Sequence, residues 1–132
     1  MGPGDTVTSF IQAIEGNDLD RALDLLDPEV EYDNVPIAKV HGPDAVRNIL
    51  APFLAGCSEV EWVVHRQVEQ DDGDGSGTVM NERTDRFRMG EGEHARWVEI
   101  PLAGLFAVRG GRIVLWRDYF DDATFRTQLT GG

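Results

Sequence analysis

Apolar residues in the first part of the chain recur every three or four positions, which is the spacing of one helical face. A first stripe follows the capping candidates Asp5 and Thr6 and ends at Gly16. A second, shorter stripe begins after Asn17 or Asp18 and is stopped by the proline that follows it. The apolar residues of the two stripes are Val7, Phe10, Ile11 and Ile14, and then Leu19, Ala22, Leu23 and Leu26. The pattern predicts two consecutive helices.

A brief strand and a third helix are expected next. Residues 30–35 have the composition of a short strand. The segment Gly42-Pro43-Asp44 is typical of a helix start, because proline is favoured in the first helical turn. The apolar stripe of this helix consists of Val46, Ile49, Leu50 and Phe53. Pro52 lies within the stripe, and we expect it to kink the helix or end it early.

After residue 57 the apolar residues alternate with polar ones, as in strands that have two different faces. Four such runs cover about 58–69, 78–88, 94–108 and 112–120, and turn segments rich in Gly and Asp separate them. A last short helix is predicted over 122–129. Helices followed by a meander of strands indicate one α+β domain over residues 1–132. We expect a curved, mixed β-sheet that forms a cone covered by the N-terminal helices.

The charge of the chain narrows the partners it is expected to bind. Its 132 residues carry a formal net charge of −12, which disfavours nucleic acid and anionic membrane surfaces. No apolar run approaches the roughly 20 residues that span a bilayer. Cys57 is the single cysteine, so an internal disulfide is excluded, and the first residues lack the features of a signal peptide. We therefore expect a cytoplasmic location.

Charged residues stand on strand faces that are otherwise apolar. Because side chains alternate between the two faces of a strand, Asp118 shares its face with Trp116 and Phe120. In an earlier run, Arg83 and Asp85 share a face with two apolar residues. A buried ion costs several kcal/mol unless it is paired. One arginine and two aspartates on inward faces satisfy each other and leave one carboxyl group for chemistry.

Tyr32 and Asn34 point to the same side of the brief strand. A phenol and a carboxamide beside a carboxylate can hold one water molecule through three hydrogen bonds, and Asp118 can then accept a proton from that water. No metal site is predicted, because the three histidines lack ligand spacing. Residues 72–77 match the front of a calcium loop, but Arg83 occupies its twelfth position, where a glutamate is needed.

Over nearly the whole chain, these residues resemble the limonene-1,2-epoxide hydrolases of the nuclear-transport-factor-2-like (NTF2-like, SnoaL-like) superfamily. The fold of that superfamily is also described as cystatin-like. The longest matching block is the last of five. The blocks are Tyr32-x-Asn34-x-Pro36, Gly42-x-x-Ala45-Val46, Glu82-Arg83-x-Asp85, Ala103-Gly104-x-Phe106 and Gly111-x-Ile113-x-x-Trp116-Arg117-Asp118-Tyr119-Phe120-Asp121.

The resemblance implies a hydrolase without a cofactor that adds water to a small apolar epoxide to give a vicinal diol. Asp118 resembles the base that activates water, and Tyr32 and Asn34 resemble the groups that position that water. Asp85 resembles the acid that protonates the epoxide oxygen, and Arg83 bridges the two aspartates. Two identical carboxyl groups can divide this work only when their surroundings separate their pKa values.

We expect apolar side chains to contact the substrate, namely Trp116, Phe120, Phe125, Leu26 and Phe53. Trp97, Glu99 and Pro101 depart from the family pattern, and we expect them to alter the pocket wall. The resemblance also implies a homodimer formed through the outer face of the sheet.

Two other functions remain open from the sequence. An isomerase or polyketide cyclase of the same superfamily uses a similar pocket for proton transfer at carbon. Such an enzyme needs one base and an oxyanion donor, and it does not need groups that hold a water molecule. A non-catalytic domain that binds small molecules is the second alternative, but it has no need for a costly cluster of buried charges.

Overall fold

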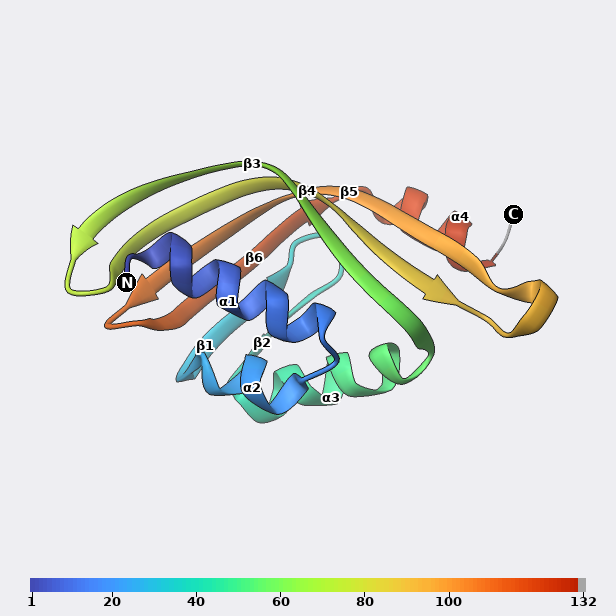
Figure 1. The fold of residues 1–132 in the computed structure, drawn as a ribbon, viewed down its shortest axis with the longest axis horizontal. Helices are drawn as coiled ribbons and strands as arrows, with labels where there is room; N and C mark the ends of the chain where they lie inside the picture. The colour runs from blue at the N-terminus through green and yellow to red at the C-terminus, as the bar shows by residue number, and fades with distance from the viewer. Residues whose placement is uncertain (131–132) are drawn as a thin grey trace.

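A strongly curved, unclosed sheet of six strands spans the molecule, and helices lie against its concave side (Figure 1). The structure is a computed structural model that describes residues 1–130. Its helices are α1 (Pro3–Glu15), α2 (Leu19–Asp24), α3 (Pro43–Ala55) and α4 (Asp122–Thr130), with a 3-10 turn at Gly92–His94. Its strands are β1 (Leu26–Asn34), β2 (Ala38–His41), β3 (Cys57–Gly73), β4 (Ser76–Met89), β5 (Arg96–Arg109) and β6 (Arg112–Phe120).

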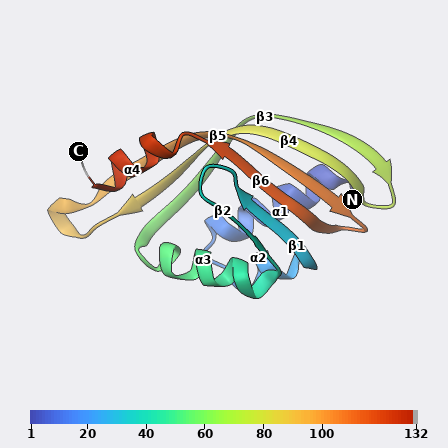
Figure 2. The same cartoon turned by 180° about the vertical axis from the view of Figure 1, so that it is seen from behind.

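The sheet is mixed, as expected. The strand order is β2-β1-β6-β5-β4-β3; β1 and β6 run parallel, and every other neighbouring pair is antiparallel. Figure 2 shows β1 and β2 at one edge of the sheet beside α3. The predicted α+β class with a curved sheet is therefore confirmed. Within residues 1–130, no helix combines the length and the apolar character that crossing a bilayer requires.

The predicted apolar stripe of α1 faces the sheet. Val7 and Phe10 are fully buried, and Phe10 contacts Trp116 edge-on with 5.0 Å between the ring centroids. Burying a side chain of this size contributes about 1.5–3 kcal/mol. The second helix begins at the predicted cap, because the Asp18 side chain accepts a hydrogen bond from the backbone N–H of Arg21.

The structure corrects two expectations about where helices end. Leu26 does not belong to the second helix; it begins β1, because the chain turns at Leu25 and joins β6 beside Ile113. Of the two outcomes expected at Pro52, the kink stays a prediction and the early end is wrong, because the third helix continues to Ala55. The residues after Pro52 explain this, since Leu54 is buried and packs inward from the last turn. Strand β2 was not predicted from the sequence.

Strands β4 and β5 alternate between a buried and an exposed face, as predicted. The alternation expected over 58–69 is not found, because Trp62 is the single buried residue of β3 and most of that strand is exposed on both faces. On β4, Val79 and Phe87 point inward, and on β5, Val98 and Ile100 do so. The expectation that Trp97, Glu99 and Pro101 alter the pocket wall is wrong, because they alternate with these inward residues and lie on the outer face. There, the Arg86 guanidinium lies 4.2 Å from the centre of the Trp97 ring and donates a hydrogen bond to Glu99.

Candidate active site

A cavity of about 370 Å³ lies between the concave side of the sheet and helices α3 and α4. Four of its lining residues carry hydroxyl, amide or carboxyl groups, namely Tyr32, Asn34, Asp85 and Asp118. The rest of the wall is aliphatic or aromatic; α3 supplies four of these residues and α4 supplies Phe125. Ile37 and Ile49 line the cavity while remaining exposed, so the mouth lies beside them. The polar groups therefore face an apolar chamber that opens to solvent.

Strand register brings together polar residues that are far apart in the sequence. The parallel pairing of β1 with β6 sets Asn34 opposite Asp118 and Tyr32 opposite Trp116. The Tyr32 ring stacks on the indole of Trp116, with 3.9 Å between the ring centroids. Asp85 reaches the same cavity from β4, two strands away from β6. No short sequence motif contains all of these residues.

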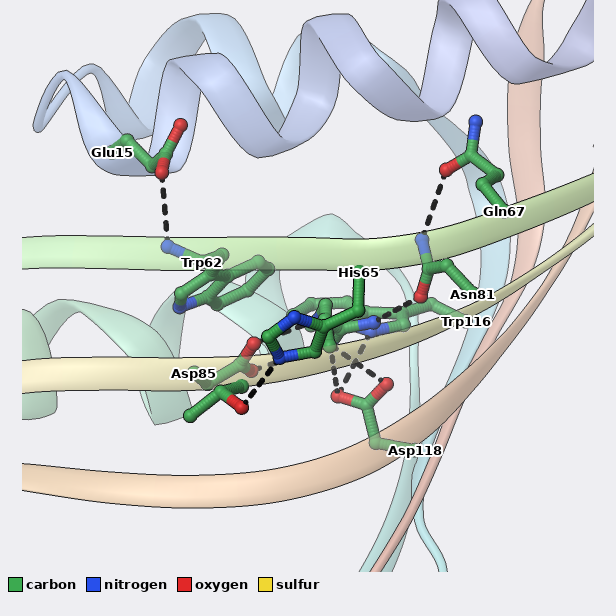
Figure 3. Close-up of polar contacts among 10 residues, drawn as sticks. Glu15, Trp62, His65, Gln67, Asn81, Asp85, Trp116 and Asp118 are labelled. Carbon is green, nitrogen blue, oxygen red and sulfur yellow. Dashed lines mark hydrogen bonds and ion pairs between the residues drawn. The ribbon is translucent and has the colours of Figure 1, made fainter.

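Arg83 joins Asp85 and Asp118, the two aspartates that are labelled in Figure 3. Its Nε donates to Asp85 Oδ1 at 2.7 Å, and its Nη2 donates to Asp85 Oδ2 at 3.3 Å. The same Nη2 lies 3.0 and 3.1 Å from the two carboxylate oxygens of Asp118. Trp116 Nε1 donates to Asp118 Oδ2 at 3.1 Å. The two carboxylates thus share one cation, and Asp118 has an additional donor.

The arginine sits behind the aspartates and does not line the cavity. Its side chain has no exposed surface, whereas the side chains of Asp85 and Asp118 retain 5% and 6%. The guanidinium lies 4.9 Å from the centre of the Trp62 ring and 5.8 Å from that of Phe106. A molecule in the cavity therefore meets carboxyl groups, while the cation acts on it only through them.

Burial gives Asp85 an unusual pKa. Removal from water raises the pKa of Asp85 to about 7; Arg83 opposes the rise, while the charges of Asp118 and Glu15 add to it. Burial also raises the pKa of Asp118, but Arg83 and the hydrogen bond from Trp116 favour its ionised form. Because Trp116 donates to Asp118 alone, a single proton on the pair is favoured on Asp85.

Tyr32 stays a phenol at any physiological pH. Burial is the main cause, and the neighbouring charge of Asp118 also raises the pKa of the Tyr32 hydroxyl. A protonated phenol donates one hydrogen bond and accepts others. Tyr32 and Asn34 together therefore offer donors and acceptors on the cavity wall beside Asp118.

The structure brings nearly all of the residues named from the sequence to one place. The predicted residues that line the cavity are Tyr32, Asn34, Phe53, Asp85, Trp116, Asp118, Phe120 and Phe125. Leu26 does not line it, and the expectation of a substrate contact there is corrected. As the first residue of β1, Leu26 is 1% exposed and packs in the core.

Trp62 and Asn81, two residues around Arg83, were not found from the sequence, and Gly104 was named only as part of a matching family block. Trp62 stacks under the guanidinium, and Asn81 Oδ1 accepts a hydrogen bond from Arg83 Nη1 at 2.9 Å. Gly104 lies opposite both Asn81 and Asp118, and an added Cβ there would collide with Arg83 Nη1. Asn81 had a usable signal, since it precedes Arg83 by two residues on the same face. Among residues 1–130, no three His, Cys, Asp or Glu side chains gather as metal ligands would.

Comparisons with known proteins place these observations in a family. Residues 2–130 match the sequence model described as the limonene-1,2-epoxide hydrolase catalytic domain. The chain is 32% identical over 115 residues to the epoxide hydrolase EphG of Mycobacterium tuberculosis, an alignment that spans 87% of this chain and 70% of that protein.

Solved structures agree with this assignment. The fold matches the structure of a limonene-1,2-epoxide hydrolase-like enzyme from M. tuberculosis with a TM-score of 0.75 and 30% identity, over 97% of this chain and 89% of the other. It also matches a putative SnoaL-like polyketide cyclase from Shewanella denitrificans with a TM-score of 0.82, over 98% of both chains, but at 14% identity. The second likeness concerns the fold alone. Together with the sequence matches, these findings establish that the chain belongs to the limonene-1,2-epoxide hydrolase family.

Proposed function

We propose that this chain, as one catalytic domain over residues 1–132, is a cofactor-independent epoxide hydrolase that converts an apolar epoxide into a vicinal diol. The observation that carries the proposal is the pair of buried aspartates bridged by Arg83 on the wall of an otherwise apolar cavity. Family membership and a relative known as an epoxide hydrolase support the reaction class. The roles of the individual residues follow from their surroundings.

Asp118 is the base in this mechanism. Its ionised carboxylate takes a proton from a water molecule held by Tyr32 and Asn34, and the water oxygen attacks an epoxide carbon. The bond between that carbon and the epoxide oxygen breaks at the same time. Removing a proton from the attacking water by a positioned base contributes about 10²–10⁴-fold to the rate.

Asp85 is the acid. It enters the reaction protonated and gives its proton to the oxygen that leaves the attacked carbon, so the product is a neutral diol. Without any shift, an aspartic acid would be almost fully ionised near neutral pH, and burial raises the pKa of Asp85 to about 7. After one turnover Asp118 holds the proton and Asp85 is ionised. A proton must then return from Asp118 to Asp85, through water or along the carboxylates that Arg83 joins.

The cavity favours an uncharged, mainly hydrocarbon substrate. Its wall presents two carboxyl groups, and the one cation in contact with them, Arg83, is fully buried behind them. An anionic group in the cavity would therefore face like charges without a cation of its own. Aromatic side chains such as Phe53, Phe120 and Phe125 offer apolar contact area.

Single turnover in oxygen-18 water tests this proposal. With enzyme in excess over a panel of apolar epoxides, direct attack by water puts one oxygen-18 into every diol molecule formed in the first turnover. A covalent ester on an aspartate would instead deliver an unlabelled carboxylate oxygen in that first turnover. The Asp118→Asn variant serves as the inactive control. Absence of diol from every epoxide, or an isomerised product without added oxygen, would contradict the proposal.

We further propose that two copies of the chain pair through the outer face of the sheet, and that the enzyme works in the cytoplasm. Strand register places Val68 beside Met80 and Met80 beside Leu105 on that face. Val68, Met80 and Tyr119 are 68%, 46% and 45% exposed. Large apolar side chains gathered on one exposed face are typical of a protein interface.

A further inference from the structure

Asn81 is a buried amide beside the charged residues, and the mechanism above gives it no task. It is 4% exposed and stands on β4 with its side chain on the same inward face as Arg83. It does not line the cavity, so it does not touch a molecule bound there. Any effect it has on the reaction must therefore pass through Arg83.

The amide of Asn81 is held at both ends. Its Oδ1 accepts from Arg83 Nη1 at 2.9 Å, and its Nδ2 donates to Gln67 Oε1 at 3.1 Å (Figure 3). Gln67 is the register partner of Asn81 on the edge strand β3. Because Gln67 takes the amide N–H, the amide oxygen is turned toward the arginine. A chain of two hydrogen bonds thus runs from the rim of the sheet to the guanidinium.

The guanidinium needs this third partner. Nε and Nη2 are bound by the two aspartates, and Nη1 points the other way, toward Asn81. The arginine side chain has no exposed surface, so water cannot replace an acceptor that is removed. With acceptors on both sides, the planar group has one orientation, in which the same Nη2 serves both carboxylates.

We propose that Asn81, oriented by Gln67, is a positioning residue that fixes Arg83 between Asp85 and Asp118 without adding a third negative charge. The inference rests on the proposed function, because the division of labour between the aspartates comes from it. Asparagine supplies an acceptor oxygen of the same shape as a carboxylate while remaining neutral. An aspartate at this position would make the arginine serve three carboxylates.

The absence of a charge on Asn81 matters because few titratable groups lie near the two aspartates. Glu15 from α1, Tyr32 from β1 and Arg83 itself are the titratable neighbours that act on them. A further carboxylate at position 81 would disfavour ionisation of both aspartates. Both limbs of the pH profile would then move to higher pH.

Kinetics of four variants test the inference. In Asn81→Ala we expect kcat to fall about tenfold or more, the effect of leaving one buried N–H without an acceptor, while KM for an apolar epoxide stays unchanged. Asn81→Asp keeps the acceptor and should recover kcat, with its pH profile displaced upward. Gln67→Ala, at the exposed rim, should lower kcat less than Asn81→Ala does. Glu82→Gln, on the outer face between Asn81 and Arg83, is the matched control with unchanged kinetics.

A folded Asn81→Ala variant with wild-type kcat and pH profile would overturn the inference, as would a change confined to KM. If Asn81→Ala fails to fold, Asn81→Asp and Gln67→Ala decide: wild-type kcat and pH profiles in both would overturn it. If the wild type opens no epoxide, the proposed function fails by itself. Carbon-13 NMR titration of the Asp85 and Asp118 carboxyl groups then settles the positioning role, because Asn81→Ala must shift both titrations and Glu82→Gln must not.

Discussion

Asp85 and Asp118 are the same side chain in two different surroundings, and that difference is the basis of the proposed chemistry. Both are buried against Arg83, but only Asp118 receives the indole N–H of Trp116, and Asp85 also feels the charge of Glu15. One extra donor favours the ionised form of one carboxyl group, and an extra negative charge favours the protonated form of the other. A single proton shared by the two carboxyl groups is therefore favoured on Asp85 before any substrate binds.

The first residue-scale prediction concerns the base. Asp118→Asn keeps the shape of the side chain and removes its ability to accept a proton, so we expect diol formation to fall by about 10²–10⁴-fold. The fold and the binding of apolar ligands should persist, because Trp116 and Phe120 remain in place. Product assay, circular dichroism and ligand titration measure the three properties. Turnover near the wild-type rate would show that Asp118 is not the base.

Removing the cation should affect stability as well as rate. Arg83→Ala leaves two buried carboxyl groups without their partner, and breaking a buried charge network in this way costs about 3–5 kcal/mol. We expect a lower free energy of unfolding in urea and loss of activity. Arg86→Ala is the matched control, since Arg86 pairs with Glu61 and Glu99 on the outer face. Equal unfolding curves for the two variants would contradict the buried role of Arg83.

The pH dependence follows from the two carboxyl groups. At low pH Asp118 gains a proton and loses its power as a base, and as pH rises through the pKa of about 7 Asp85 loses the proton that it donates. The profile of kcat/KM should therefore be bell-shaped, with limbs that belong to the coupled pair. Replacing the three histidines one at a time should leave it unchanged. A plateau without a basic limb up to the pH of unfolding would contradict the two-carboxyl mechanism.

At the scale of single residues, the alternation of side chains along each strand was enough to find the buried charged residues. Asp118 between Trp116 and Phe120, and Arg83 two residues before Asp85, stood out because each put charge on an apolar face. Trp62 carried no such mark, because a tryptophan on an inward face is ordinary for a core. Its stacking with Arg83 depends on the pairing of β3 with β4, which one strand alone does not reveal.

At the scale of elements, β5 separates β4 from β6 and yet lets their side chains meet. Asn81 and Asp118 flank Gly104 in register, and the guanidinium of Arg83 passes over this glycine. The missing side chain makes room for an arginine to reach from β4 to β6. The backbone of β5 therefore joins β4 to β6, while Gly104 leaves space for the Arg83 side chain to cross between them.

Gly104→Ala tests that role. A methyl group would meet Arg83 Nη1 and lie 2.9 Å from Asn81 Oδ1, neither of which is free to move in a packed interior. We expect overpacking to cost about 1–3 kcal/mol of stability, together with most of the activity. Ala103→Gly, which changes the neighbouring position on the exposed face, is the control. An active, fully stable Gly104→Ala variant would mean that Arg83 has room to reach Asp118 by another path.

Local sequence signals predicted most of the elements and failed where tertiary contacts decide. Pro52 has the local character of a helix end, but Leu54 beyond it is buried, and this packing keeps the last turn helical. Leu26 continues a helical spacing, yet the backbone pairing of β1 with β6 takes it into a strand. Strand β2 is four residues long and mostly exposed, so it has no apolar pattern to recognise.

For the whole molecule, the order of strands was beyond the sequence pattern. A meander was visible, but the parallel contact of β1 with β6 joins segments more than eighty residues apart and leaves no local trace. That one contact sets Tyr32 and Asn34 beside Trp116 and Asp118. The family resemblance placed these four residues in one site, which the periodicity of the sequence alone did not do.

The proposed dimer gives a prediction at the same scale. Glutamate in place of Met80 puts a charge at the centre of the apolar outer face, so we expect Met80→Glu to sediment as a monomer where the wild type sediments as a dimer. Val35→Glu, at an exposed apolar position on the turn after β1, is the control and should leave the mass unchanged. A wild type that is monomeric at micromolar concentration would contradict the proposed pairing.

The residues of the cavity wall come partly from the sheet and partly from the helices, and this affects how the substrate preference of the protein can change in evolution. The groups that we propose to react stand on β1, β4 and β6, whereas Ile49, Leu50, Phe53 and Leu54 come from α3 and Phe125 comes from α4. We therefore expect mutation on the helices to change which molecule fits while the proposed proton-transfer groups stay in place. Proteins that evolve from this one can therefore gain new substrates through substitutions on α3 without an inactive intermediate.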